Sequence, residues 1–134
     1  MKNEKLISIV IPIYNGAKYI SNIYTNIMNQ TYRPIELIFV NDGSKDDSEN
    51  VLKDIVKMHN CKSEIKIIIL SGPNGGIAVA RNRGMAASTG EYVMFADQDD
   101  WLEKDCVEKL MQVAGLTDAD MVIGGFRKVN QKGE

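Results

Sequence analysis

The stretch Leu6-Ile-Ser-Ile-Val-Ile-Pro-Ile13 decides the fold of this 134-residue chain. Isoleucine and valine dominate it, and β-branched residues favour extended structure. The run is apolar at almost every position, which is typical of a strand that is buried on both faces of a parallel sheet. Similar runs recur along the chain, and we expect further strands over Ile35–Val40, Ile65–Leu70, Tyr92–Ala96 and Met121–Gly125.

Helical patterns separate these runs. Apolar residues at helical spacing predict an amphipathic helix over Ala17–Gln30. Ser44 resembles the N-cap of a second helix, whose apolar stripe contains Val51, Leu52, Ile55 and Val56. A third helix carries small residues between Ala78 and Ala87, and Val107, Leu110, Met111 and Ala114 mark a fourth. Strands that alternate with helices predict an α/β protein, a three-layer α/β/α sandwich with a mainly parallel sheet and right-handed crossovers.

Composition limits the classes of function. Apolar residues make up 44% and charged residues 25%, as in an ordinary soluble domain, and the net charge is −2. That charge argues against nucleic acid or an anionic membrane as the main partner. We find neither a signal peptide nor an apolar run of membrane-spanning length, and we therefore expect a cytoplasmic protein. His59 is the only histidine, and Cys61 and Cys106 lie far apart, so histidine-rich zinc sites, Ser/His catalysis and a disulfide are not expected.

The polar residues of turns gather where the predicted strands end. They are Tyr14-Asn15, Asn41-Asp42-Gly43-Ser44, the segment 71–76 and Asp97-Gln98-Asp99-Asp100. Each segment alone is explained by an ordinary turn, because Asn, Asp, Gly and Ser are the usual turn residues. The carboxyl ends of parallel strands meet at one edge of a sheet, where ligands bind in open α/β folds. The four segments together therefore predict a site.

The acidic run is the sharpest of these signals. If the chain leaves its strand extended, Asp97 and Asp99 point to one side and Gln98 faces away. Two adjacent carboxylates favour a divalent cation, and their hard oxygen ligands suit Mg²⁺ or Mn²⁺. Asp100 is as well placed to cap the next helix as to contact a ligand.

The absence of two phosphate-binding motifs excludes or disfavours some classes of nucleotide-binding enzyme. No G-x-x-x-x-G-K-[ST] segment is present, and no G-x-G-x-x-G follows the first strand, which excludes P-loop enzymes and disfavours Rossmann dehydrogenases. The turn at 73–76 opens a helix that carries Arg81. This arginine is a candidate contact for a nucleotide or a phosphate.

Four of these motifs, in this order, resemble the family 2 glycosyltransferases of the GT-A fold. They are Ser8-Ile9-Val10-Ile11-Pro12-Ile13-Tyr14-Asn15, Asn41-Asp42-Gly43-Ser44, Asn74-Gly75-Gly76-Ile77-Ala78-Val79-Ala80-Arg81-Asn82-Arg83-Gly84 and Phe95-Ala96-Asp97-Gln98-Asp99-Asp100-Trp101. The resemblance spans nearly the whole chain. It implies a nucleotide-diphosphate-sugar transferase that binds its donor, usually a UDP-sugar, through Mg²⁺ or Mn²⁺.

The resemblance also implies a role for each position. Pro12, Ile13, Tyr14 and Asn15 would shape the nucleotide pocket, and Asp42 would accept a hydrogen bond from the base. Arg81 would lie near the base and phosphates. Asp97 would bind the ribose or the metal, Asp99 would be the principal metal ligand, and Gln98 belongs to the nucleotide-binding set by its place in the motif. The resemblance also implies a part in cell-envelope polysaccharide synthesis, with a saccharide or lipid-linked acceptor.

One expected part is missing from the sequence. Enzymes of this family use a carboxylate base downstream of the acidic run to activate the acceptor hydroxyl for an inverting displacement, and no residue after the fifth predicted strand suits that role. We therefore expect 1–134 to be a single nucleotide-sugar-binding domain, truncated before the acceptor-binding part, with the base beyond Glu134. Such a fragment would transfer sugar weakly or not at all.

Two other readings remain open. A sugar nucleotidyltransferase would need a basic, glycine-rich loop after the first strand, where Tyr14-Asn15-Gly16-Ala17-Lys18 holds one basic residue. A Mg²⁺-binding flavodoxin-like or receiver-like regulatory domain would also place acids at strand ends, but a receiver needs paired acids after the first strand.

Overall fold

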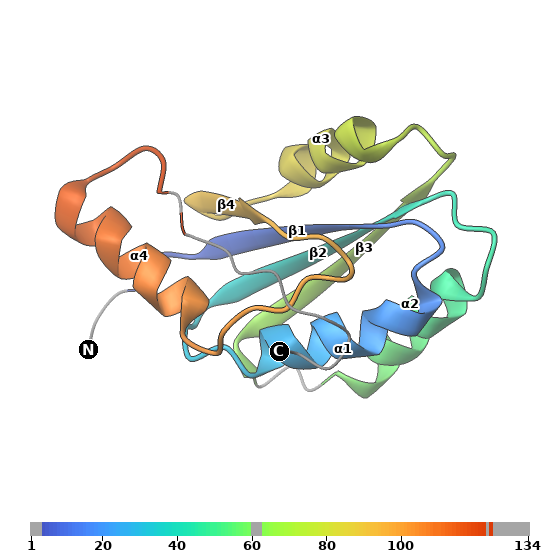
Figure 1. The fold of residues 1–134 in the computed structure, drawn as a ribbon, viewed down its shortest axis with the longest axis horizontal. Helices are drawn as coiled ribbons and strands as arrows, with labels where there is room; N and C mark the ends of the chain where they lie inside the picture. Colours follow the sequence, from blue (N-terminus) through green and yellow to red (C-terminus); the bar gives the residue numbers. More distant parts are fainter. Residues whose placement is uncertain (1–3, 60–62, 123, 125–134) are drawn as a thin grey trace.

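A computed structural model describes residues 4–59, 63–122 and 124. Figure 1 shows strands and helices in alternation, with a sheet between layers of helices. The strands are β1 (Ile7–Ile13), β2 (Ile35–Asp42), β3 (Ile65–Gly72) and β4 (Tyr92–Phe95), and the helices are α1 (Ala17–Met28), α2 (Ser48–Met58), α3 (Ile77–Ala87) and α4 (Cys106–Thr117). The strand pairings among these residues are all parallel, in the order β3-β2-β1-β4. The predicted fold class is confirmed.

The alternation of side chains along β1 divides the core between the two faces of the sheet. Odd-numbered isoleucines from Ile7 to Ile13 pack with buried side chains of α1 and α2. Val10 points to the other face and packs with Ala80 of α3. The helices α1 and α2 lie together on one side of the sheet and α3 lies on the other (Figure 1), which gives the three layers.

The small residues of α3 let this helix approach the sheet closely. Gly84 is buried, and a Cβ atom added to it would overlap the side chain of Val10. The close approach matters for the site because it brings the first turns of α3 over the carboxyl ends of β1 and β2. No helix among the described residues is long and apolar enough to cross a membrane.

Two local predictions, the fifth strand over 121–125 and the helix cap at Ser44, differ from the structure in its described residues. Of the fifth strand predicted over 121–125, Ile123 and Gly125 lie outside the described residues, and Met121, Val122 and Gly124 form no strand. Ser44 does not cap a helix: Asp47 holds the N-cap position of α2, and the Ser44 hydroxyl accepts a hydrogen bond from the Asn15 amide. A tertiary hydrogen bond has replaced the local one.

The short strand β4 creates an opening at the carboxyl edge of the sheet. It pairs with β1 only as far as Val10, which lies opposite Phe95. In contrast, β1 and β2 remain paired as far as Ile13 and Asn41. Beyond Phe95 the chain leaves the sheet, so no strand among the described residues pairs with the last residues of β1 on that side.

A buried carboxylate fixes the opposite edge. Glu36 of β2 is 1% exposed, and its carboxylate accepts hydrogen bonds from the Ser8 hydroxyl and from both the amide and the hydroxyl of Thr89. Burial acts to raise the pKa of Glu36, but these hydrogen bonds and the charge of Lys66 outweigh it and leave the pKa below its usual value. The charged group thus ties the α3–β4 connection to β1 and β2.

This arrangement predicts acid-sensitive stability. Because the folded-state pKa of Glu36 is lowered, its contribution is complete above the unfolded pKa of about 4.3 and is lost as the pH falls through the folded value. We expect Glu36→Ala to lower the free energy of unfolding at pH 7 by about 2–4 kcal/mol, since it leaves buried donors unpaired. Glu36→Gln should cost less and flatten the pH dependence, as denaturant unfolding at pH 7 and pH 4 would measure. A Gln variant with an unchanged pH slope would contradict this role.

Candidate functional site

A cleft of about 560 Å³ lies at the carboxyl edge of the sheet, on the side of α3. Residues from all four strand ends line it: Pro12, Tyr14, Asp42, Asn74, Gly76, Ile77, Arg81, Asp97, Gln98 and Asp99. Seven of these were predicted from the sequence. The other three, Asn74, Gly76 and Ile77, belong to the glycine-rich turn and the start of α3, where the sequence marked the turn but assigned no residue.

Asp42 ends β2 and holds the turn that precedes α3. Its Oδ1 accepts a hydrogen bond from the Gly75 amide at 2.8 Å, and its Oδ2 accepts one from the Gly76 amide at 3.0 Å. Gly76 is the N-cap residue of α3, and it contributes no side-chain cap. The carboxylate therefore caps α3 from another strand, where it also meets the positive end of the helix dipole. It is 4% exposed.

The turn after β2 has to be narrow to let this contact form. Gly43 has a φ of +70°, and a Cβ atom on it would lie 2.5 Å from the Asn74 amide nitrogen. Both the backbone conformation and the close approach of the 73–76 turn therefore require glycine.

Arg81 joins α3 to the acidic run. Its guanidinium donates to Oδ1 of Asp97 at 3.4 Å, between side chains that are 43% and 50% exposed. It also lies 5.9 Å from the centre of the Phe95 ring, and its buried Nε has no hydrogen-bond partner among the described residues. A long, exposed ion pair of this kind contributes little stability, so Arg81 can exchange it for a stronger anionic ligand.

The acidic run differs from the extended conformation that the sequence led us to expect. The Asp100 amide donates to the Asp97 carbonyl, which closes a turn with Gln98 and Asp99 at its centre. The Asp100 carboxylate accepts from the Asp97 amide at 2.8 Å, and α4 begins only at Cys106. Asp100 therefore locks this turn and does not cap the helix.

The orientation of the Gln98 side chain also differs from the one predicted. It does not face away from the site but lines the cleft, and its side-chain amide contacts the backbone of Tyr14. The turn, and not the alternation of an extended strand, sets the direction of this side chain.

Two residues of the predicted nucleotide set lie outside the cleft. Ile13 is fully buried and packs in the core on the α1 and α2 face. Asn15 is exposed and connects neighbouring loops, because its amide donates to Ser44 and its side-chain carbonyl accepts from the Lys45 amide. Neither residue lines the cleft.

Two carboxylates in the cleft suit a divalent cation. Asp97 and Asp99 lie in one turn, and Asp99 is exposed and makes no hydrogen bond or ion pair within the described part of the chain. Among the described residues no cluster of three or more acidic, histidine or cysteine side chains has the arrangement of a closed metal site. Mg²⁺ commonly takes one or two carboxylates and completes its shell with water and phosphate, so this pair fits an open site.

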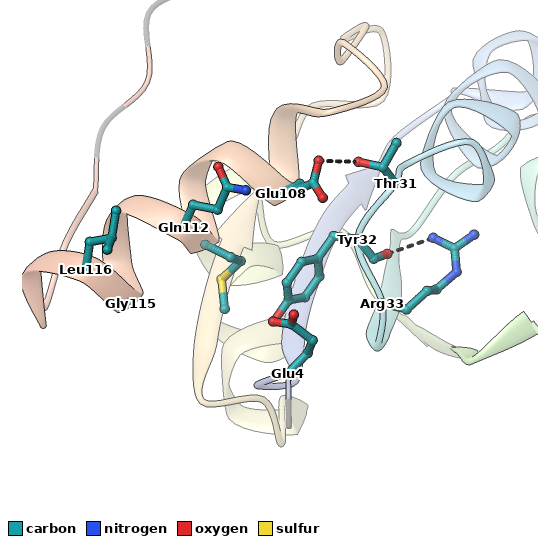
Figure 2. A pocket seen from close by; sticks show the side chains of 9 residues that line it. Glu4, Thr31, Tyr32, Arg33, Glu108, Gln112, Gly115 and Leu116 are labelled. Atoms are coloured by element: carbon teal, nitrogen blue, oxygen red, sulfur yellow. Dashed lines mark hydrogen bonds between the residues drawn. The ribbon is translucent and has the colours of Figure 1, made fainter. Parts of the chain in front are cut away.

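A second hollow, of about 610 Å³, lies between α4 and the segment before β2. Figure 2 shows Thr31 and Glu108 joined across it, with Tyr32 and Glu4 at its side. Arg33 is occupied, since its guanidinium donates to the carbonyls of Met28, Gln30, Tyr32 and Ser63. This hollow is at the amino edge of the sheet, and Thr31, Glu108 and Arg33 in its lining already have protein partners. The cleft at the carboxyl edge is therefore the candidate site.

The Asp42 contact yields a prediction for stability. An asparagine at this position can accept from only one of the two glycine amides and turns its NH₂ toward the other, so Asp42→Asn should lower the free energy of unfolding by about 1–3 kcal/mol. Urea unfolding measures this change. The matched control is Asp47→Asn, an exposed aspartate at the start of α2 that makes no side-chain cap, and it should change stability far less. Equal effects of the two substitutions would contradict the capping role.

Known proteins resemble this chain in sequence and in fold. The model of "Glycosyl transferase family 2" matches residues 8–134. The chain is 35% identical to glycosyltransferase GlyA and 38% identical to glycosyltransferase GlyG, both of Streptococcus pneumoniae, over 93% and 92% of its length, and it spans only 17% and 40% of those proteins. The structure of S. aureus TarS 1–349 in complex with UDP-GlcNAc superposes with a TM-score of 0.73 at 25% identity, over 93% of this chain and 37% of that one. The chain belongs to glycosyl transferase family 2.

Proposed function

We propose that the cleft binds a nucleotide-diphosphate sugar through a divalent cation held by Asp97 and Asp99. The observation that carries this proposal is the position of Asp99, an exposed carboxylate at the carboxyl edge of a parallel sheet that has no partner among the described residues. Family membership supports the transferase reading. The regulatory-domain and nucleotidyltransferase alternatives gain no comparable support.

The charge of the cleft supports a metal. Its lining contributes the carboxylates of Asp42, Asp97 and Asp99 and the single guanidinium of Arg81. A diphosphate that enters such a site meets net repulsion, which a bound Mg²⁺ or Mn²⁺ removes. The cation would act as a Lewis acid and offset the charge that develops on the departing diphosphate.

The residues of this chain then have separate tasks. Arg81, released from its weak contact with Asp97, would donate to phosphate oxygens, for which its planar guanidinium is well suited. Asp42 uses one lone pair on each oxygen for a glycine amide and keeps the others, so it can still accept from a base N–H. Pro12 and Tyr14 would line the base side, and a UDP-sugar is the proposed donor, as TarS was solved with UDP-GlcNAc.

The remainder of the reaction needs residues that we do not assign within this chain. We propose an inverting displacement by the hydroxyl of a saccharide or lipid-linked acceptor of cell-envelope polysaccharide, with the carboxylate base beyond Glu134. The chain covers well under half of GlyA and GlyG, which supports a donor-binding portion that alone transfers sugar weakly or not at all. These assignments extend to the whole protein only as proposals.

Thermal unfolding with ligand tests the donor site. A ligand at about 100 times its Kd stabilises the folded state by about 2.7 kcal/mol, so UDP with Mn²⁺ should raise the Tm by several degrees. Asp99→Ala should abolish the metal-dependent part of that rise, whereas Asp54→Ala, at an exposed position on α2, should keep it. If neither UDP nor any other nucleoside diphosphate shifts the Tm of the wild type, the proposed function is wrong.

A further inference from the structure

The side chain of Gln98 binds both polar groups of one peptide segment. Its Oε1 accepts a hydrogen bond from the Tyr14 amide at 3.0 Å, and its Nε2 donates to the Tyr14 carbonyl at 3.2 Å. The residues are 84 positions apart. A primary amide supplies one acceptor and one donor on the same plane, so the two contacts fix the orientation of the amide as well as its position.

The glycine at position 16 leaves room for this amide. A Cβ atom on Gly16 would overlap Oε1 of Gln98 and lie 2.8 Å from its Cδ, and the three nearest atoms all belong to Gln98. The φ of Gly16 is −109°, a value that alanine also adopts. Backbone conformation therefore does not explain this glycine, whereas the amide of Gln98 does.

The partner of Gln98 is itself firmly held. The amides of Asn15, Gly16 and Ala17 donate to side-chain oxygens of Ser44, Ser48 and Asp46. These bonds attach the β1–α1 loop to the loop between β2 and α2. A contact to Tyr14 therefore anchors the acidic turn to a loop that is itself held by three hydrogen bonds.

We propose that Gln98 is a positioning residue of the donor site, which fixes the Asp97–Asp100 turn against the β1–α1 loop and so aims Asp97 and Asp99 into the cleft. This inference rests on the proposed function for the ligand, but the contact of Gln98 with Tyr14 does not. Gln98 is the central residue between the two aspartates. Any rotation of the turn that its amide prevents would otherwise move both carboxylates.

A double-mutant cycle on the unliganded protein tests the contact. Gly16→Ala and Gln98→Ala should each lower the Tm by about 4 °C, because each removes the same two hydrogen bonds. In the Gln98→Ala background, Gly16→Ala should cost almost nothing, since its Cβ atom then meets no amide. Gly115→Ala on α4, where a Cβ atom has nothing within 4 Å, and Gln112→Ala at an exposed site serve as controls. Additive losses in the cycle would overturn the contact.

Binding measurements test the positioning. We expect Gln98→Ala and Gly16→Ala to weaken UDP binding in Mn²⁺ by about tenfold at a temperature where both variants are folded. Their affinity for UDP without metal should change little, because the lost restraint acts on the metal-binding carboxylates, whereas a purely structural role would leave the metal-dependent gain intact. Wild-type affinity of Gln98→Ala in Mn²⁺ overturns the proposal. A wild type that binds no nucleotide refutes the proposed function and the positioning role with it, and the thermal cycle still decides the contact.

Discussion

Backbone amides at the ends of parallel strands have lost their partners in the sheet, and this constraint shapes the whole carboxyl edge. Amides that the sheet leaves unpaired bind other acceptors, and here neighbouring loops supply them through side-chain oxygens. Tyr14 donates to Gln98, Asn15 to Ser44 and Gly16 to Ser48, while Gly75 and Gly76 donate to Asp42. Each loop thus satisfies another, and the four strand ends form one connected rim.

The rim explains why so few polar groups remain for a ligand. Asp42 caps α3, Asp100 locks its own turn and Gln98 binds Tyr14. In the acidic run only Asp99 makes no hydrogen bond or ion pair within the described residues, and Asp97 has a long contact to Arg81. A site that is preorganised in this way binds with little reorganisation, because the surrounding groups are already fixed.

The sequence predicts the strands and helices of the three layers well, but it predicts the hydrogen bonds between the loops of the rim poorly. The isoleucine-rich run Ile7–Ile13 carries a strong local signal, since a strand that is buried at every position demands mostly apolar residues. The position of the site also follows, because it depends only on where strands end. The roles of Ser44 and Gln98 do not follow, since their partners lie 29 and 84 residues away and no local pattern encodes them. Their nearest neighbours in sequence predicted a helix cap for Ser44 and strand alternation for Gln98, whereas tertiary hydrogen bonds determine where both side chains lie.

Asp42 shows how structural and ligand-binding roles meet in one group. A carboxylate offers about four acceptor positions, and the two glycine amides use one on each oxygen. The remaining positions would serve a base N–H without release of the turn, so recognition of the donor would need no movement of α3. Because one carboxylate would serve both roles, a change that disturbs it also loosens the turn at Gly75 and Gly76. The start of α3, from which Arg81 extends, is then altered as well. Loss of binding in an Asp42 variant therefore identifies a base contact only when the stability of the rim is measured alongside it.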